Sequence, residues 1–107
     1  MSKVLVINRG YHDYSDAQRF GKLTFMSEGR LDKYCVGKIL RDFEPFIKDS
    51  EKDDHILVSS MTVANILAGC LFVLKHKALN LLIYNEQERK YISRRIMLDN
   101  LLYNMAD

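Results

Sequence analysis

The chain has 107 residues, of which 48% are hydrophobic and 28% are charged. This is the size and composition of one globular domain, and it excludes two separate cores, a disordered chain and a fibrous repeat. Sixteen Lys and Arg against fourteen Asp and Glu leave a formal net charge of +2, which argues against binding to long DNA or RNA because such binding needs many cations. A small anion needs only a few cations and stays allowed. We therefore expect a single domain over residues 1–107, with a thin core.

The sequence predicts neither a secretory signal nor a membrane span. The apolar run at residues 4–7 is too short for a signal peptide, and the longest apolar run, residues 63–74, is shorter than the roughly 20 residues that a span needs. Cys35 and Cys70 lie in apolar stretches without CxxC spacing, so we expect buried free thiols in a reducing cytoplasm. We expect no metal site and no cofactor.

The first quarter of the chain predicts two strands joined by a long loop. Residues 4–7 form a continuous aliphatic run, which is typical of a strand buried on both faces. Residues 22–26 alternate between apolar and polar side chains and predict a second strand. The polar and aromatic residues 10–21 between them are expected to form a loop, and long loops in small domains are usually functional or mobile.

A helix and a surface loop follow. From Arg30 onward, apolar residues recur three and four positions apart and predict an amphipathic helix. Pro45 should end or kink that helix at the preceding residue. The charged residues 48–54 are expected to form a solvated surface loop, and residues 55–59 then predict a buried strand.

The second half predicts a helix, a hairpin and a short tail. Ser60 and Thr62 offer N-cap chemistry at the start of a helix over residues 62–76. Residues 78–84 predict a buried strand, and a polar connection joins it to an alternating strand over residues 91–98, so the two should pair as a hairpin. Asp99 can cap a short amphipathic tail.

The predicted fold class is α/β: a small mixed sheet of about five strands and two main helices, in the order β-β-α-β-α-β-β. Residues 56–84 make one strand-helix-strand unit, for which a right-handed parallel crossover is the strong default. The helix over residues 62–76 is apolar nearly all round and must be covered on two sides. The sheet covers one side, and we expect another subunit to cover the other.

Candidate binding residues gather where the predicted parallel strands end, because ligands of open α/β sheets collect there. A helix start such as Ser60 to Thr62 favours phosphate. The loop after the first strand combines a cation, two aromatic rings and a carboxylate, which suits a purine nucleotide, and two arginines on the last strand point to opposite faces, so only one can enter a given site. The candidates are Asn8, Arg9, Tyr11, Asp13, Tyr14, Ser60, Thr62, Arg94 and Arg95.

Each of these features also has a purely structural interpretation. Ser60 or Thr62 can simply cap the helix, the tyrosines of the loop can pack on the core, and the arginines can face water. Catalysis by His12 with Asp13, or by a serine nucleophile, has no GxSxG or HxH pattern to support it. His55 and His76 are expected to be structural or surface residues.

Segments 7–17 (INRGYHDYSDA), 23–29 (LTFMSEG) and 76–84 (HKALNLLIY) together resemble the Thoeris anti-defence sponge proteins, a family of small phage proteins. The resemblance implies a homo-oligomer, in the cytoplasm of the infected bacterial host, that sequesters a cyclic ADP-ribose isomer made by TIR-domain immune enzymes. It also implies that cyclic oligonucleotide signals can be bound, that ligands lie at subunit interfaces, and that nothing is cleaved.

On this hypothesis Arg9 and one of Arg94 or Arg95 neutralise two phosphates, with help from N–H groups near Ser60 and Thr62. Tyr11 or Tyr14 stacks on adenine, and Asn8 or Asp13 takes the ribose hydroxyls. Two other functions remain open: a small hydrolase or lyase that destroys a cyclic nucleotide signal with His12 and Asp13 as acid and base, and an oligomeric interaction module without a ligand.

Overall fold

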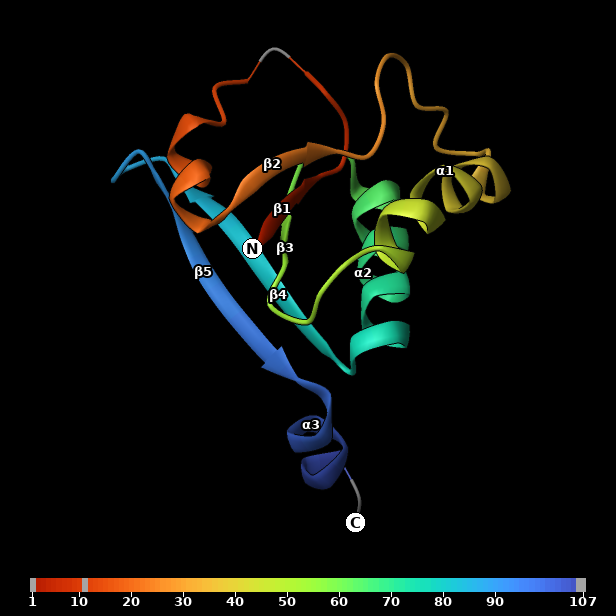
Figure 1. Cartoon of the computed structure of the whole chain (residues 1–107), viewed down its shortest axis with the longest axis vertical. Helices are drawn as coiled ribbons and strands as arrows, with labels where there is room; N and C mark the ends of the chain where they lie inside the picture. The colour runs from red at the N-terminus through yellow and green to blue at the C-terminus, as the bar shows by residue number, and fades with distance from the viewer. Residues whose placement is uncertain (1, 11, 106–107) are drawn as a thin grey trace.

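The computed structural model describes residues 2–10 and 12–105. Five strands form one sheet in the order β2-β1-β3-β4-β5, in which the first four are parallel and β5 is antiparallel to β4 (Figure 1). The strands are β1 (Lys3–Val6), β2 (Lys22–Phe25), β3 (His55–Leu57), β4 (Ala78–Asn85) and β5 (Lys90–Met97). The helices are η1 (a 3-10 helix, Ser15–Phe20), α1 (Val36–Lys48), α2 (Thr62–His76) and α3 (Leu98–Met105). The predicted α/β class and mixed sheet are confirmed.

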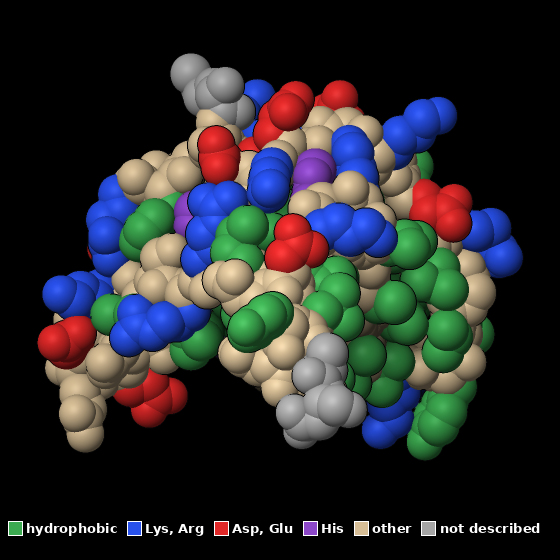
Figure 2. Space-filling view, turned by 90° about the horizontal axis from the view of Figure 1, so that it is seen from below, with side chains coloured by type: hydrophobic (Ala, Val, Ile, Leu, Met, Phe, Trp, Pro, Cys, Tyr) green, Lys and Arg blue, Asp and Glu red, His purple; other side chains and the backbone are tan. Residues whose placement is uncertain are grey.

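The sheet is covered unequally on its two faces. Helices α1 and α2 lie together on one face, η1 lies on the other, and α3 stands at the far end of β5 (Figure 1). Figure 2 views the molecule from the α3 end, where acidic and basic side chains are interspersed and hydrophobic side chains gather on the side that carries α2.

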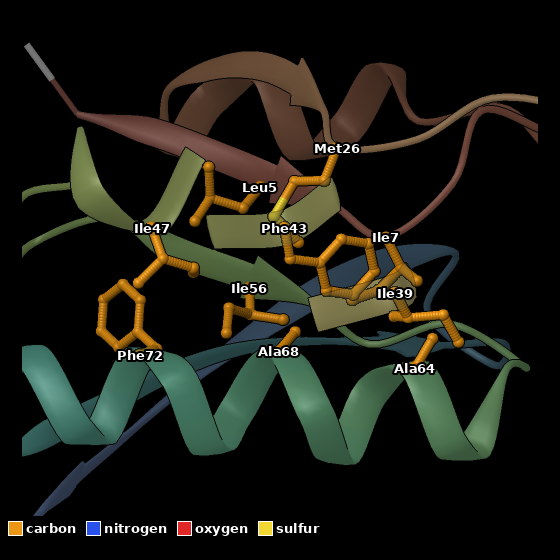
Figure 3. Close-up of a cluster of buried hydrophobic side chains, with 10 residues drawn as sticks. All are labelled: Leu5, Ile7, Met26, Ile39, Phe43, Ile47, Ile56, Ala64, Ala68 and Phe72. Carbon is orange, nitrogen blue, oxygen red and sulfur yellow. The ribbon is translucent and has the colours of Figure 1, made fainter. Parts of the chain in front are cut away.

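The main core lies between the sheet and the two long helices (Figure 3). From α2 it receives Ala64, Ala68 and Phe72, which recur every four residues and so share one face of the helix. The two alanines let the helix approach the sheet, and Phe72 is fully buried. The other buried members are Leu5, Ile7, Met26, Ile39, Phe43, Ile47 and Ile56. A smaller cluster on the opposite face joins η1 to the sheet through Val4, Val6, Ala17, Leu57, Leu82 and Tyr91.

The loop and the helix start predicted for residues 10–35 differ from the structure. The expected loop at residues 10–21 contains η1, which is fixed because Asp16 accepts a hydrogen bond from the Tyr91 N–H (2.7 Å) and Ala17 is buried. The first helix starts at Val36 rather than Arg30. The Asp32 carboxylate accepts a hydrogen bond from the Tyr34 N–H at 2.9 Å, and this local bond holds a turn in place of the first helical turns.

Pro45 lies inside α1 instead of ending it. Proline removes one helical hydrogen bond, but the residues that follow still gain from continuing the helix because Phe46 packs on the core and Ile47 is buried. The end of α1 is closed by α2: the Lys75 ammonium donates to the carbonyl oxygens of Ile47 and Ser50 at 3.2 and 2.7 Å. Tertiary burial therefore overrides the local signal.

The charged stretch at residues 48–54 is a surface loop only in part, because Ser50 and Asp54 are buried within it. The Asp54 carboxylate accepts hydrogen bonds from the backbone N–H groups of Lys3 and Glu51, both at 2.8 Å. It joins the start of β1 to the start of β3.

Both cysteines are free, as predicted, but both are exposed, so the prediction of buried thiols is wrong. Cys35 precedes α1 and does not belong to its inward stripe, and Cys70 lies on the face of α2 that points away from the core. His76 is a structural residue, as expected, because its Nε2 lies 2.8 Å from the Ser50 hydroxyl.

Candidate functional site

A hollow of about 500 Å³ lies at the carboxyl ends of β1, β3 and β4. The chain leaves β1 for β2 on one side and later returns to β3 on the other, so the strand order reverses between β1 and β3. Open α/β sheets bind ligands at such a switch point. We call this the carboxyl-edge hollow, and it is lined by Asn8, Gly10, His12, Asp13, Tyr14, Leu57, Val58, Ser59, Ser60, Met61, Tyr84, Glu86 and Tyr91.

Three tyrosines line the carboxyl-edge hollow. The rings of Tyr84 and Tyr91 meet edge to face with centroids 5.1 Å apart, and burial raises the pKa of the Tyr91 phenol. Tyr14 packs edge to face on Phe25 at 5.8 Å and donates from its hydroxyl to the Asn8 carbonyl oxygen at 3.4 Å. Tyr84 is 44% exposed, so its ring is open to a flat partner.

The charged groups of this hollow are acidic. Asp13 and Glu86 line it, and among the described lining residues there is no lysine or arginine. Asp13 accepts a hydrogen bond from the Ser15 N–H at 2.9 Å, which lowers the pKa of its carboxyl group. These carboxylates suit hydroxyl or amino donors and repel phosphate, so the hollow fits the base and sugar of a nucleotide better than its phosphate.

The turn between β3 and α2 forms a wall that separates two hollows. Asn65 closes this turn: its amide donates to the Ser59 carbonyl oxygen at 2.8 Å, and its own oxygen accepts from the Ser59 N–H and hydroxyl. The Ser59 hydroxyl in turn accepts from the Met61 N–H at 3.0 Å. The turn is therefore held by Ser59 and Asn65, and no side chain caps the N-terminus of α2.

A second hollow, of about 600 Å³, lies on the other side of that turn. We call it the helix-start hollow because residues 60–64, at the start of α2, line it together with Arg30, Lys33 and other residues of the segment after β2. Ser60 and Met61 line both hollows, which makes them neighbours across one short turn. Asp32 also lines this hollow, and its carboxylate accepts a hydrogen bond from the Tyr34 N–H. The two cations outnumber this one carboxylate, and with the uncapped helix start they provide the charge and the N–H donors that a phosphate needs.

The structure brings some predicted site residues together. Asn8, Asp13, Tyr14 and Ser60 line the carboxyl-edge hollow, and Ser60 and Thr62 line the helix-start hollow. The Asn8 amide is engaged, since it donates to the Gly29 carbonyl oxygen at 2.8 Å and accepts from the Ser27 hydroxyl at 2.9 Å. Tyr11 lies outside the described residues.

The three predicted arginines do not converge on either hollow. Arg9 pairs with Glu28 at 3.0 Å and lies over the Phe25 ring, 3.8 Å from its centroid. Arg95 lies near the start of β4, where it pairs with Asp53 at 3.5 Å. Arg94 lies on the opposite face of β5, beside Ile92. The expected neutralisation of two phosphates by these arginines therefore has no geometric support in one copy of the chain.

The candidate residues predicted from the sequence do not include Tyr84, Tyr91, Glu86, Arg30 and Lys33, although Glu86 follows the end of a predicted parallel strand. Tyr84 and Glu86 come at the end of β4, and Arg30 and Lys33 follow the end of β2. The rule that ligands collect at the carboxyl ends of parallel strands makes these four candidates, but it does not choose them over other residues at strand ends. Arg30 and Lys33 were assigned to a helix instead, and Tyr91 joins the site only through the β4–β5 pairing.

A family model described as phage Pam3 gp32-like protein matches residues 3–98, which is nearly the whole chain. The chain belongs to this phage family. No curated protein and no solved structure matches it. This membership confirms the prediction that the chain belongs to a family of phage proteins. The narrower resemblance to Thoeris anti-defence sponges stays a prediction.

Two negative findings concern residues 2–10 and 12–105. No helix in these ranges is long and apolar enough to cross a membrane. No group of three or more His, Cys, Asp or Glu side chains in them could hold a metal ion.

Proposed function

We propose that this member of the Pam3 gp32-like family binds a small nucleotide, with the base and ribose in the carboxyl-edge hollow and phosphate in the helix-start hollow. The observation that carries the proposal is the shared wall. Ser60 and Met61 line both hollows, so one ligand can reach across the turn from an aromatic, acidic site to a cationic one.

The carboxyl-edge hollow offers what a base and a ribose need. The exposed ring of Tyr84 provides a stacking surface, and stacking on an aromatic ring contributes roughly 1–3 kcal/mol per base. Asp13 and Glu86 can accept hydrogen bonds from ribose hydroxyls or from an exocyclic amino group. Its volume of about 500 Å³ lies within the range of small-ligand sites.

The helix-start hollow offers what a phosphate needs. The first N–H groups of a helix have no partner within the helix, and at the start of α2 no capping side chain accepts a hydrogen bond from them. Arg30 and Lys33 supply positive charge beside them, and the hydroxyls of Ser60 and Thr62 are available as donors. These two cations replace the arginines that the sequence suggested.

We further propose that the ligand is a cyclic ADP-ribose isomer and that cyclic oligonucleotide signals are bound as well. The protein sequesters its ligand without cleavage and so blocks TIR-dependent Thoeris immunity in the host cytoplasm. The sequence resemblance supports this narrower identity. Sequestration needs tight binding, and a nanomolar dissociation constant corresponds to about 12 kcal/mol. No cofactor is required.

Binding without turnover is supported by how the reactive side chains are engaged. The Ser59 hydroxyl is 3.0 Å from the Asn65 oxygen and accepts from the Met61 N–H, so it is held as part of the turn. Hydrogen bonds from Ser15 lower the pKa of the Asp13 carboxyl group, which weakens it as a general base. The competing hypothesis is a hydrolase or lyase that uses His12 and Asp13.

The deciding experiment is recovery of the ligand. The protein is incubated with a cyclic ADP-ribose isomer and, in parallel, with a cyclic dinucleotide; unbound ligand is removed, the protein is heat-denatured, and the supernatant is analysed by mass spectrometry. Recovery of the intact isomer supports the sponge. Conversion products, in the supernatant or in the unbound fraction, overturn it in favour of the enzyme. Failure either to retain or to convert the compounds overturns both hypotheses and leaves an interaction module.

Variants test the position of the site. Arg30→Ala with Lys33→Ala removes two charged partners of a phosphate, each worth about 1.5–3 kcal/mol, and should weaken binding by roughly a hundredfold or more. Tyr84→Ala should weaken binding by roughly tenfold through lost stacking. Arg95→Ala is the matched control, since it removes a cation paired with Asp53 away from both hollows. Equal losses in all three variants would refute this placement.

A further inference from the structure

Helix α3 carries an apolar stripe along its whole length. Leu98, Leu101, Leu102 and Met105 recur at the spacing i, i+3, i+4 and i+7, which puts them on one face of a helix. Leu101, Leu102 and Met105 are 43%, 54% and 74% exposed. This pattern and these exposures indicate a helix that binds to another surface, because a helix docks into an apolar groove through anchors at this spacing.

Within residues 2–10 and 12–105, α3 is covered only in part. None of its described residues is buried, and its attachment to the body includes the hydrogen bond from the Leu98 N–H to the Lys77 carbonyl oxygen at 3.1 Å. Figure 1 shows α3 beyond the end of β5, clear of the two-helix layer.

An apolar groove of about 650 Å³ lies between α2 and β4 on the helix-covered face of the sheet. We call it the α2 groove. Ile66 and Leu74, which line it on the α2 side, are 64% and 69% exposed. Its other lining residues are Ile56, Val58, Asn65, Gly69, Cys70, Val73, Lys77, Leu79 and Leu81. This is the second apolar side of α2, and Figure 2 shows the hydrophobic area on that side of the molecule.

We infer that α3 of one copy of this chain docks into the α2 groove of a second copy, and that the exchange is reciprocal. The dimensions match: α3 has eight residues and is about 12 Å long, and the rise along α2 from Ile66 to Leu74 is also about 12 Å. The charges match as well, since Asp99 is the charged described residue of α3 and Lys77 lies at the groove.

A second copy is the favoured occupant because each chain presents both halves of the contact. In a two-fold dimer the helix of each copy meets the groove of the other, so the contact forms twice and the assembly closes. A foreign helix would leave α3 itself uncovered. The stripe and the groove share no lining residue with the helix-start hollow, and the groove meets the carboxyl-edge hollow at Val58 but not at its tyrosines. The inference therefore does not depend on nucleotide binding.

Oligomeric state tests the contact from both sides. The wild-type chain should sediment as a dimer. Leu101→Glu in the stripe and Leu74→Glu in the groove should each raise the dimer dissociation constant by roughly thirtyfold or more, the loss expected for a central anchor. Both positions are exposed in one copy, so the fold should survive. Tyr103→Glu is the matched control, since Tyr103 is 83% exposed and lies on the opposite side of α3 from the stripe.

A disulfide locates the contact. In a Cys35→Ser background, Leu102→Cys places a thiol on the stripe, and Cys70 supplies an exposed thiol in the groove. Mild oxidation should give a covalent dimer that reductant dissolves and that Cys70→Ser abolishes. A disulfide within one chain would show that α3 folds onto its own groove, and a wild-type monomer would show that no second copy binds; either result overturns the inference.

Discussion

The side chain of Asn65 and the residue Ser59 share three hydrogen bonds, at 2.8, 3.0 and 3.1 Å, across the turn that leads from β3 into α2. The side-chain amide takes the place of backbone partners and satisfies both the N–H and the carbonyl of Ser59. An asparagine inside an apolar helix thus fixes the wall that separates the two hollows.

Asn65→Ala should therefore lower both stability and ligand affinity. Leaving partly buried backbone groups of Ser59 without partners costs roughly 1–3 kcal/mol, and a loosened turn should weaken nucleotide binding by about tenfold or more. Urea unfolding and calorimetric titration measure the two effects. Asn85→Ala is the control, since its oxygen accepts two backbone N–H groups in an exposed hairpin turn. If Asn65→Ala binds as the wild type does, the turn does not position the site.

Asp54→Asn should destabilise the fold much more than the neighbouring Asp53→Asn. The buried Asp54 carboxylate accepts one N–H on each oxygen, and an amide would turn a donor toward one of them, at a cost of roughly 2–4 kcal/mol. The Asp53 carboxylate is 75% exposed and should change stability by about 0.5 kcal/mol or less. Thermal unfolding of both variants makes the comparison, and equal melting temperatures would contradict it.

Phe72→Ala should cost roughly 3–5 kcal/mol, because it opens a cavity between α2 and the sheet. The ring is fully buried and its centroid is 4.4 Å from that of His76. Tyr34→Ala, at a side chain that is 83% exposed, should leave the unfolding midpoint within about 0.5 kcal/mol of the wild type. A small effect of Phe72→Ala would mean that the core repacks around the gap.

Stability should fall as the pH is lowered from about 7.5 to 5. Burial lowers the pKa of both His55 and His76, so the folded protein holds these protons less tightly than the unfolded chain, whose histidines titrate near pH 6.5. Protonation then favours unfolding. The contribution of these two histidines to the free energy of unfolding is fully present above the unfolded pKa and is lost as the pH falls from there through the lower folded pKa. Urea midpoints across this range measure the slope, which His55→Gln with His76→Gln should flatten. An unchanged slope would assign the effect to other groups.

A separate loss of stability, due to Asp16, should appear below about pH 4. The hydrogen bond from the Tyr91 N–H lowers the pKa of the Asp16 carboxyl group, so this contribution is present above the unfolded pKa and is lost as the pH falls through the folded one. Asp16→Asn should reduce the acid sensitivity in that window and leave the slope between about pH 5 and 7 unchanged. A change in the upper window instead would separate Asp16 from the acid transition.

Much of the fold could be predicted because its signals are local. The residues 62–76 predicted for α2 are those observed, since the helix has an apolar period and a polar start. The β4–β5 hairpin follows from two strand patterns around one polar turn. By contrast, η1 depends on the contact of Asp16 with Tyr91, 75 residues away, and α1 continues past Pro45 because of what Ile47 buries.

The location of the candidate site could be predicted from the sequence, but the cations that line it could not. The rule for strand ends led to Asn8 and Ser60, and the composition of the loop after the first strand led to Asp13 and Tyr14. All four line the carboxyl-edge hollow. The cations could not be chosen in this way, because any arginine near a strand end satisfies the rule. Arg9 is drawn instead to Glu28 and the ring of Phe25, a choice set by its three-dimensional neighbours.

The position of β1 has a consequence for synthesis. It is made before the other four strands of the sheet, yet it is an inner strand, with β2 on one side and β3 on the other. Lys3 pairs with Lys22 soon afterwards, but the partner of Val4 on the other side is His55. Until β3 has been made, one edge of this apolar strand has no neighbour, and distant pairing of this kind is slow. In the nascent protein, the sheet around β1 can therefore be completed only after β3 has emerged.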